Sequence, residues 1–430
     1  MTDARQAAEG VARASYGRLV ALLASRSRDI AAAEDALAEA FRTALEVWPR
    51  RGVPERPDAW LLTVARRSLG HAHRHGRVRE AAAGTLALLH EEMQEREPDR
   101  IPDGRLKLLF VCAHPAIEPS VRTPLMLQTV LGLEAERIAG AFLASPAAMS
   151  QRLVRAKAKI RDAGIRFVEP DPDDLPARLE AVLSAVYAAY GTAWDATPGA
   201  AEGGGLGAEA IYLGRVLAGL MPGEPEVLGL LALMLYCEAR TKARRDADGA
   251  FVPLDRQDHT LWSRDLVIEA EGLLTAASRI GRFGRFQTEA AIQSVHVQRP
   301  FTGRTNTRAL VMLHDLLAEQ APSIGAHVSR AAVHGEAFRA QAGLTLLDAL
   351  EPARIETYQP YWAVRAHLLR RAGREAEAGP AFTRAMGLTE DPAVRAHLAA
   401  EAAAGRAVPA GTGEPHPRPR AAPPPPPPAP

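Results

Sequence analysis

The sequence predicts an all-α protein, and three observations carry that prediction. Ala, Leu, Arg and Glu dominate the 430 residues whereas β-branched runs are few, and this composition favours helices over strands. Apolar residues recur at steps of three and four through most of the chain, as they do on the buried face of a helix. Clusters of Pro and Gly separate these periodic stretches and mark where helices end.

Residues 11–48 are expected to form two helices, because two apolar stripes follow one another there. The first stripe consists of Val11, Ala14, Leu19, Leu22 and Leu23. The second consists of Ile30, Ala33, Ala36, Leu37, Ala40, Phe41, Leu45 and Trp48. A third helix is expected to begin at Asp58, a good N-cap after the Pro-rich residues 49–57. Its inward residues are Trp60, Leu61, Val64 and Leu69.

The third helix continues into a basic stretch, residues 66–79, that contains no acid. Its basic residues and histidines are Arg66, Arg67, His71, His73, Arg74, His75, Arg77 and Arg79. On a helix His71 and His75 share a face, but no Cys or acid lies near enough in sequence to complete a metal site. We therefore expect no metal here and interpret the stretch as a surface for nucleic-acid phosphates.

A second helical block at 105–165 ends in a short helix, a tight turn and a strongly basic helix. The short helix is expected at 134–142. Ser145 is a good N-cap for the basic helix, and Pro146 suits its first position. The inward residues of the basic helix are Met149, Leu153, Ala156 and Ile160. Its open face holds Ala147, Ser150, Gln151, Arg152, Arg155 and Lys159.

This succession predicts a helix-turn-helix, whose second helix fits the major groove of DNA. Ser150, Gln151 and Arg152 are placed to reach base edges. The basic residues further along suit phosphates, and they are Arg155, Lys157, Lys159 and Arg161. The alternative is a solvated surface helix, since a run of charges on an all-helical protein usually has no further role.

Residues 175–400 are expected to be helical, with one clear repeat unit near their end. The unit has the spacing of a tetratricopeptide helix pair, set by Trp362, Ala366, Leu369, Ala378, Phe382 and Ala385. One such pair cannot bury its faces alone, so we expect an array of helical hairpins. The Pro-rich residues 405–430 are expected to be disordered.

Charge and cysteine usage restrict the class of protein further. Residues 1–165 hold 25 Lys or Arg against 20 Asp or Glu although the whole chain carries only +1, which permits a nucleic-acid contact at one end. Two distant cysteines, Cys112 and Cys237, form no disulfide framework. The sequence has no signal-peptide core and no apolar run of about 18 residues, so we expect a cytoplasmic protein without a membrane contact.

Three stretches, read in order, resemble the sigma-70 family of RNA polymerase initiation factors. They are "AEDALAEAFRTALEVWP", "PDAWLLTVARR" and "IAGAFLASPAAMSQRLVRAKAKI". The chain is similar to the extracytoplasmic-function (ECF) group, which has only sigma regions 2 and 4. "LKLLFVCAHPAI" and "LDRQDHTLW" resemble the subgroup with a C-terminal tetratricopeptide-like (TPR-like) helical extension. The resemblance covers about residues 10–400.

The resemblance implies a domain order and a set of contacts. The domains would be region 2 at 8–80, an acidic linker at 81–104, region 4 at 105–165, the extension at 170–402 and the tail at 405–430. Core polymerase would be bound by Asp35, Glu39 and Arg42. The −10 promoter element would be bound by Trp60, Arg66, Arg67, His71, Arg74 and Arg77. The −35 element would be bound by Ala147, Ser150, Gln151, Arg152, Arg155, Lys157 and Lys159.

The implied partners are core RNA polymerase, through its β′ clamp and β subunit, and promoter DNA, both double-stranded and as the melted −10 strand. The extension would regulate the factor, with a regulatory protein as a further partner. The resemblance implies no cofactor and no catalytic activity.

Three alternatives remain open on the sequence. One is a stand-alone helix-turn-helix regulator, which would bind DNA as a symmetric dimer. Another is an interaction scaffold built on the TPR-like repeats. The third is an enzyme that uses Asp255, Asp258 and His259 as an acid/base or metal cluster, although no phosphate-binding loop or nucleophile motif lies nearby.

Overall fold

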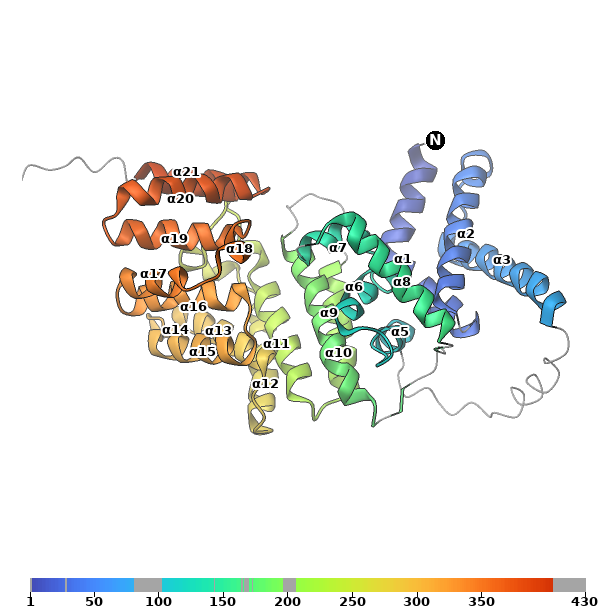
Figure 1. The fold of residues 1–430 in the computed structure, drawn as a ribbon, viewed down its shortest axis with the longest axis horizontal. Coiled ribbons are helices and arrows are strands. Elements are labelled where there is room, and N and C mark those ends of the chain that lie inside the picture. The colour runs from blue at the N-terminus through green and yellow to red at the C-terminus, as the bar shows by residue number, and fades with distance from the viewer. Residues whose placement is uncertain are drawn as a thin grey trace, which may run out of the picture. The chain divides into compact units, whose positions relative to one another are not determined.

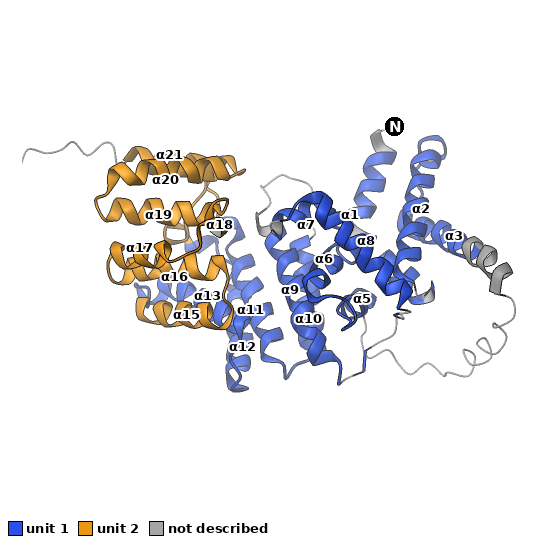
Figure 2. Ribbon diagram, in the orientation of Figure 1, with its two compact units in different colours: residues 1–242, 259–306 blue, residues 243–258, 307–430 orange. Residues whose placement is uncertain are grey.

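The computed structural model describes residues 2–27, 29–80, 103–142, 144–163, 165, 170–171, 173–195 and 206–404. Over these ranges the chain is helical and forms no strand, so the all-α prediction is confirmed. An isolated antiparallel bridge joins Arg245 to Phe251. The chain forms two compact units (Figure 2), residues 1–242 with 259–306 and residues 243–258 with 307–430, called unit 1 and unit 2 below.

Unit 1 holds the thirteen helices that the described residues form up to Thr302, numbered as in Figure 1. They are α1 (Thr2–Ser27), α2 (Ile30–Arg51), α3 (Pro57–Glu80), α5 (Gly104–Cys112), α6 (Pro119–Thr129), α7 (Ala135–Ala141), α8 (Pro146–Asp162), α9 (Leu175–Asp195), α10 (Leu206–Leu220), α11 (Pro225–Ala239), α12 (Arg264–Arg279), α13 (Arg285–Val297) and α14 (Arg299–Thr302). Short 3₁₀ turns lie at η1 (Thr241–Ala243), η2 (Leu254–Arg256) and η3 (His259–Leu261).

A single hydrophobic core runs through unit 1, from α1 to α13. The segments that the sequence assigns to regions 2 and 4 therefore share this core with α9–α13. The division between units falls after residues 242 and 306, inside the segment expected to form one extension.

Apart from Ala14, whose side chain lies outside the described residues, the first three helices follow the predicted stripes with three differences. Leu22 and Leu45 were expected inside but are 42% and 49% exposed. Asp29, whose Oδ1 accepts from the Ala32 N–H at 3.0 Å, caps α2. Asp58 was expected to cap α3, but it lies in the first turn and its carboxylate binds Arg18 on α1 at 2.9 Å. The N-cap prediction for Asp58 is therefore wrong, and its charge links two helices instead.

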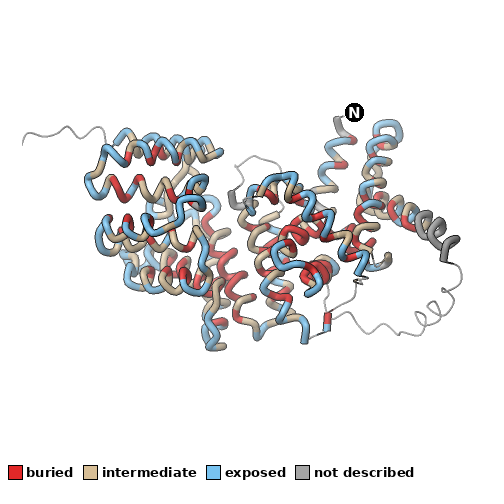
Figure 3. The backbone as a smooth tube through the Cα atoms, viewed as in Figure 1, coloured by how far each residue is buried: buried red, intermediate tan, exposed pale blue. Residues whose placement is uncertain are grey.

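Helix α11 is buried on all sides, as the red stretches along it in Figure 3 show. It packs against α9, α10, α12 and α13. Its contact with α13 is close, because a Cβ added to Gly229 would lie 2.6 Å from the backbone nitrogen of Gln287. The carboxylate of Glu226 accepts from the N–H groups of Phe286 and Gln287, at 2.9 and 3.1 Å, and so serves the first turn of α13.

Unit 2 is a succession of helices in which α15 packs on α16, α16 on α17, α17 on α19, α19 on α20 and α20 on α21. They are α15 (Thr307–Gln320), α16 (Ile324–Ala337), α17 (Ala340–Asp348), α18 (Pro352–Ile355), α19 (Gln359–Arg371), α20 (Glu375–Leu388) and α21 (Pro392–Ala404). The residues expected to set the helix pair are buried between α19 and α20, with Trp362 partly so. Residues 405–430, expected to be disordered, lie outside the described residues.

A strap formed by residues 243–258 belongs to unit 2, although its flanking helices α11 and α12 belong to unit 1. Arg245 forms an ion pair with Asp391, which in turn caps the start of α21 by accepting from the Ala393 N–H at 2.8 Å. The ring of Phe251 meets that of His397, with centroids 5.4 Å apart. Side-chain contacts with α21 therefore hold the strap in place.

Candidate nucleic-acid interface

Helix α7 ends at Ala141 and α8 begins at Pro146, with residue 143 between them outside the described residues. Ser145 has an extended backbone, with φ −75° and ψ 146°, and its hydroxyl accepts from the Ala148 N–H at 3.3 Å. Pro146 occupies the first helical turn, where a missing N–H costs nothing. The predicted start of the basic helix is confirmed.

The predicted apolar stripe of α8 is also confirmed, since Met149, Leu153, Ala156 and Ile160 are all buried. Through this stripe α8 packs against α7, α6 and α2. The opposite half of the helix is exposed, and it includes six of the seven residues expected at the −35 element. These six are Ala147, Ser150, Gln151, Arg152, Arg155 and Lys159.

The exposed half of α8 has a central line and two flanks. At about 100° per residue, Ala147, Gln151, Val154 and Ala158 lie within about 50° of the line opposite the buried stripe, as do Arg155 and Asp162, and we call the four uncharged residues the crest of α8. Arg152, Arg155 and Lys159 lie on one side of the crest, with Ser150, Lys157 and Arg161 on the other. Val154 is 67% exposed and is not among the residues expected to contact the −35 element. The signal in the sequence was spacing: Val154 follows Gln151 by three residues and Ala147 by seven, so it lies on the same side of the helix as they do.

Lys157 differs from the other expected −35 residues because it is bound inside unit 1. Its Nζ lies 2.7 Å from Oε2 of Glu34 on α2, and the two side chains are only 22% and 10% exposed. The other carboxylate oxygen of Glu34, Oε1, is buried without a hydrogen bond. This pair joins the basic helix to α2, and nothing in the apolar pattern of either helix predicts it.

The residues expected at the −10 element lie on α3, and the structure describes the side chains of only three of them. Arg66 and Arg67 are exposed. Trp60 is half-buried, and its ring meets the edge of Trp48 on α2 with centroids 5.5 Å apart. The side chains of His71, Arg74 and Arg77 lie outside the described residues, as do those of His73 and His75 and residues 81–102 of the acidic linker expected at 81–104.

The residues expected to bind core polymerase share one face of α2. Asp35 and Arg42 are exposed and Glu39 is half-exposed. The Arg42 guanidinium binds Glu39 at 2.9 Å and Glu46 at 2.6 Å. A hydrogen bond from Arg42 lowers the pKa of Glu39. The three residues form a solvated, charged row one turn apart.

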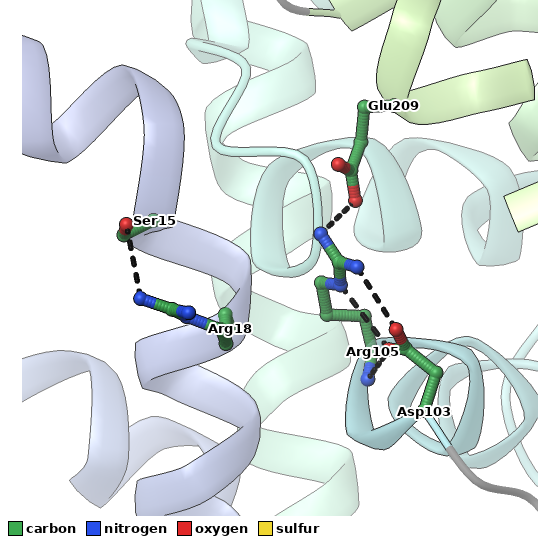
Figure 4. Close-up of polar contacts among 5 residues, drawn as sticks. All are labelled: Ser15, Arg18, Asp103, Arg105 and Glu209. Atoms are coloured by element: carbon green, nitrogen blue, oxygen red, sulfur yellow. Dashed lines mark hydrogen bonds and ion pairs between the residues drawn. The ribbon is translucent and has the colours of Figure 1, made fainter. Parts of the chain in front are cut away.

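Partly buried ion pairs join α5 to α10. Arg105 on α5 binds Asp103 at 2.9 Å and also binds Glu209 on α10 (Figure 4). Burial alone would raise the pKa of Asp103, but hydrogen bonds and the charge of Arg105 lower it. Burial raises the pKa of Glu209 despite the same arginine. The same view shows Arg18 directed at Ser15 on α1, 3.5 Å away.

The proposed acid/base or metal cluster of Asp255, Asp258 and His259 finds no support in the geometry. All three residues are exposed. Among the residues that the structure describes, no group of three His, Cys, Asp or Glu side chains could hold a metal ion. The first two belong to the strap, which side-chain contacts fasten to α21.

The two cysteines form no disulfide. Cys112 is buried at the end of α5, where burial and the nearby Glu34 carboxylate raise the pKa of its thiol. A thiol in this setting is unreactive. Within the described ranges, no helix combines the length and the apolarity needed to cross a bilayer.

Comparisons with known proteins place the chain in a family. Residues 178–278, which reach from α9 into α12, match a family of unknown function, DUF6596. An uncharacterized protein of Rhizobium meliloti (strain 1021) is 38% identical over 393 residues, which cover 87% of this chain and 92% of that protein. No solved structure matches the chain. The chain therefore belongs to the same family as the Rhizobium meliloti protein.

Proposed function

We propose that the protein is an ECF-type sigma factor that directs core RNA polymerase to specific promoters. In this proposal α1–α3 act as region 2, α5–α8 act as region 4, and unit 2 forms the TPR-like regulatory part of the extension. The protein has no catalytic activity of its own. The three sequence stretches that resemble the sigma-70 family support the assignment, and they lie on α2, α3 and α7–α8.

One observation carries the proposal: α8 is a side-chain-capped helix whose free half presents polar and basic groups. The cap fixes where α8 begins, and the four buried residues fix its rotation against α7. Six of the expected −35 residues consequently face solvent together. This is the arrangement in which a second helix enters the major groove, with basic residues left for phosphates.

Initiation then requires α8 to leave α2. Both α3 and α8 pack against α2, and its 22 residues span about 33 Å. The −10 and −35 elements are about 25 base pairs apart, roughly 85 Å at 3.4 Å per base pair. Helices packed on one short helix cannot reach both elements at once, so the Lys157–Glu34 pair must break when the factor engages a promoter.

The test is run-off transcription on a genomic promoter library, with purified core polymerase and the full-length chain. We expect discrete new start sites that fade with Arg155→Ala and with Arg152→Ala. If either arginine contacts a phosphate, its loss should reduce the salt slope of promoter binding by about 0.9. Arg279→Ala, at the exposed end of α12, is the matched control and should leave both readouts unchanged.

Two other outcomes would end the proposal in different ways. Sequence-specific DNA binding by the protein alone, without new start sites, would identify a stand-alone regulator. Neither DNA binding nor new start sites would leave the interaction scaffold. The full chain is required in every arm, because deleting residues beyond 170 would remove α9–α13 from the core of unit 1.

A further inference from the structure

The crest of α8 is methyl-rich although both of its flanks are basic. Three of its four residues, Ala147, Val154 and Ala158, carry only aliphatic groups, and Gln151 lies between the first two. Val154 is 67% exposed, in a helix whose apolar packing is already complete in Met149, Leu153, Ala156 and Ile160. Valine is a poorer helix former than Lys, Arg or Ala, so neither packing nor helix propensity accounts for it there.

Single exposed apolar residues are common on proteins and need no explanation by themselves. Ile268 on α12 is an example, at 58% exposure. Val154 differs in its surroundings, because Arg155 lies on one side of it and Arg161 on the other. When a helix with this charge distribution enters a major groove, its flanks meet the phosphates and its crest meets the base edges.

We infer that Val154 reads the C5-methyl group of a thymine in the major groove of the −35 element. The inference rests on the proposed function and adds a specificity-determining residue to it. Thymine is the base that presents a methyl group in the major groove, and apolar side chains recognise it by contact. Ala147, two turns before Val154, leaves space for the groove wall to approach. Gln151 has the amide that pairs with adenine N6 and N7.

The experiment uses the holoenzyme formed from core polymerase and the full chain. Promoters are first selected from a library randomised across the −35 region. Each thymine of the selected element is then replaced by deoxyuridine, which differs only in lacking the methyl group. We expect one position at which deoxyuridine weakens promoter binding about four-fold, the equivalent of one buried methyl group.

Val154→Ala should bind the thymine and deoxyuridine promoters equally, with the affinity that the wild type has for deoxyuridine. Ile268→Ala is the matched control, because it truncates an equally exposed aliphatic residue on another helix, and it should keep the four-fold preference. Val154 is exposed, so its truncation should leave the melting temperature unchanged, and this comparison excludes misfolding.

Each contrary outcome has a distinct meaning. An enriched −35 sequence with no sensitivity to deoxyuridine overturns the inference and leaves the proposed function standing. A four-fold preference that survives Val154→Ala overturns the inference as well, because another residue would then contact the methyl group. Failure to enrich any −35 sequence overturns both.

Discussion

Helices α8 and α11 belong to the same unit and have similar lengths, 17 and 15 residues, yet they bury their residues in opposite ways. Helix α8 buries one stripe of four residues, and its other half carries polar and charged residues around a few exposed aliphatic ones. Helix α11 is apolar on all sides and packs against four other helices. Packing therefore dictates most of the sequence of α11, whereas folding does not require the exposed half of α8. A functional explanation is needed only for α8.

The same contrast bears on the family match. Residues 178–278 contain all of α10 and α11, and their side chains fill the core of unit 1. The expected promoter contacts lie outside that match, at residues 60–77 and 147–159. The match over residues 178–278 therefore reflects the packing of unit 1, and it does not include the residues expected to bind promoter DNA.

The largest effect should come from closing the space between α11 and α13. Gly229→Ala would place a Cβ 2.6 Å from the backbone nitrogen of Gln287, and backbone cannot move aside as a flexible side chain can. We expect a loss of about 3 kcal/mol in the free energy of unfolding, measured by chemical denaturation. Gly140→Ala on α7 is the control, because no atom lies within 4 Å of its added Cβ. Equal stabilities for the two variants would contradict the packing of α11.

Two neighbouring residues on α8 should behave as differently as the two helices do. Leu153 is buried, so Leu153→Ala should cost about 3 kcal/mol of stability through the cavity that it leaves. Val154→Ala should change the stability by less than about 0.5 kcal/mol, since Val154 is mostly in water. Thermal unfolding of both variants tests this. A costly Val154→Ala would mean that the crest packs against protein.

Removing one member of the Lys157–Glu34 pair should cost less than either core change. Lys157→Met would leave the Glu34 carboxylate nearly buried and unpaired, at a cost of about 2 kcal/mol. Combining it with Glu34→Gln should restore most of the loss, because an uncharged pair has no charge to solvate. A double-mutant cycle from denaturation curves measures the coupling. If the changes in the free energy of unfolding of the two single variants add up to that of the double variant, the two side chains do not interact.

The smallest effect concerns pH and the ion pairs that Arg105 forms. The pKa of Asp103 is lowered in the folded protein relative to about 3.9 in unfolded chains. Its carboxylate thus stabilises the fold above that unfolded value, and the contribution is lost as the pH falls through the lower folded pKa. Asp103→Asn keeps a side chain that can cap α5 but removes the titrating carboxylate. Between pH 5 and pH 2 the variant should therefore lose less stability than the wild type, and the difference between the two losses should be under about 1 kcal/mol.

Glu209 provides the control with the opposite sign, because burial raises its pKa. Its charge opposes folding at neutral pH, and protonation removes that cost as the pH falls through the raised pKa. Glu209→Gln should therefore lose more stability than the wild type on acidification. Identical pH profiles for both variants and the wild type would contradict these assignments.

Local rules were sufficient to predict most of α8. Its start follows from Ser145 and Pro146, and its buried face follows from apolar residues at steps of four, three and four. The helix pair α19–α20 was found in the same way, from spacing alone. Both predictions concern residues close together in sequence, where cap chemistry and helical periodicity decide the structure.

The remaining features depend on partners far apart in sequence. Asp58 is a reasonable cap by type, but Arg18 on another helix takes its carboxylate. Leu45 fits the stripe of α2 but is 49% exposed. Glu34 has no local reason to be buried until Lys157 packs onto it. Such contacts depend on which helices pack together and at what register. The apolar periodicity of a single sequence does not predict either.

The strap also has a consequence for the order in which the chain is made. Arg245 emerges from the ribosome 146 residues before its partner Asp391. At 5–20 residues per second, the strap must wait about 7–30 s for α21 to exist. During that interval the carboxyl end of α11 leads into a segment without its side-chain partners, while the helices on both sides of it can already fold. Synthesis that stops before Asp391 would therefore leave a nearly complete unit 1 with its strap unfastened.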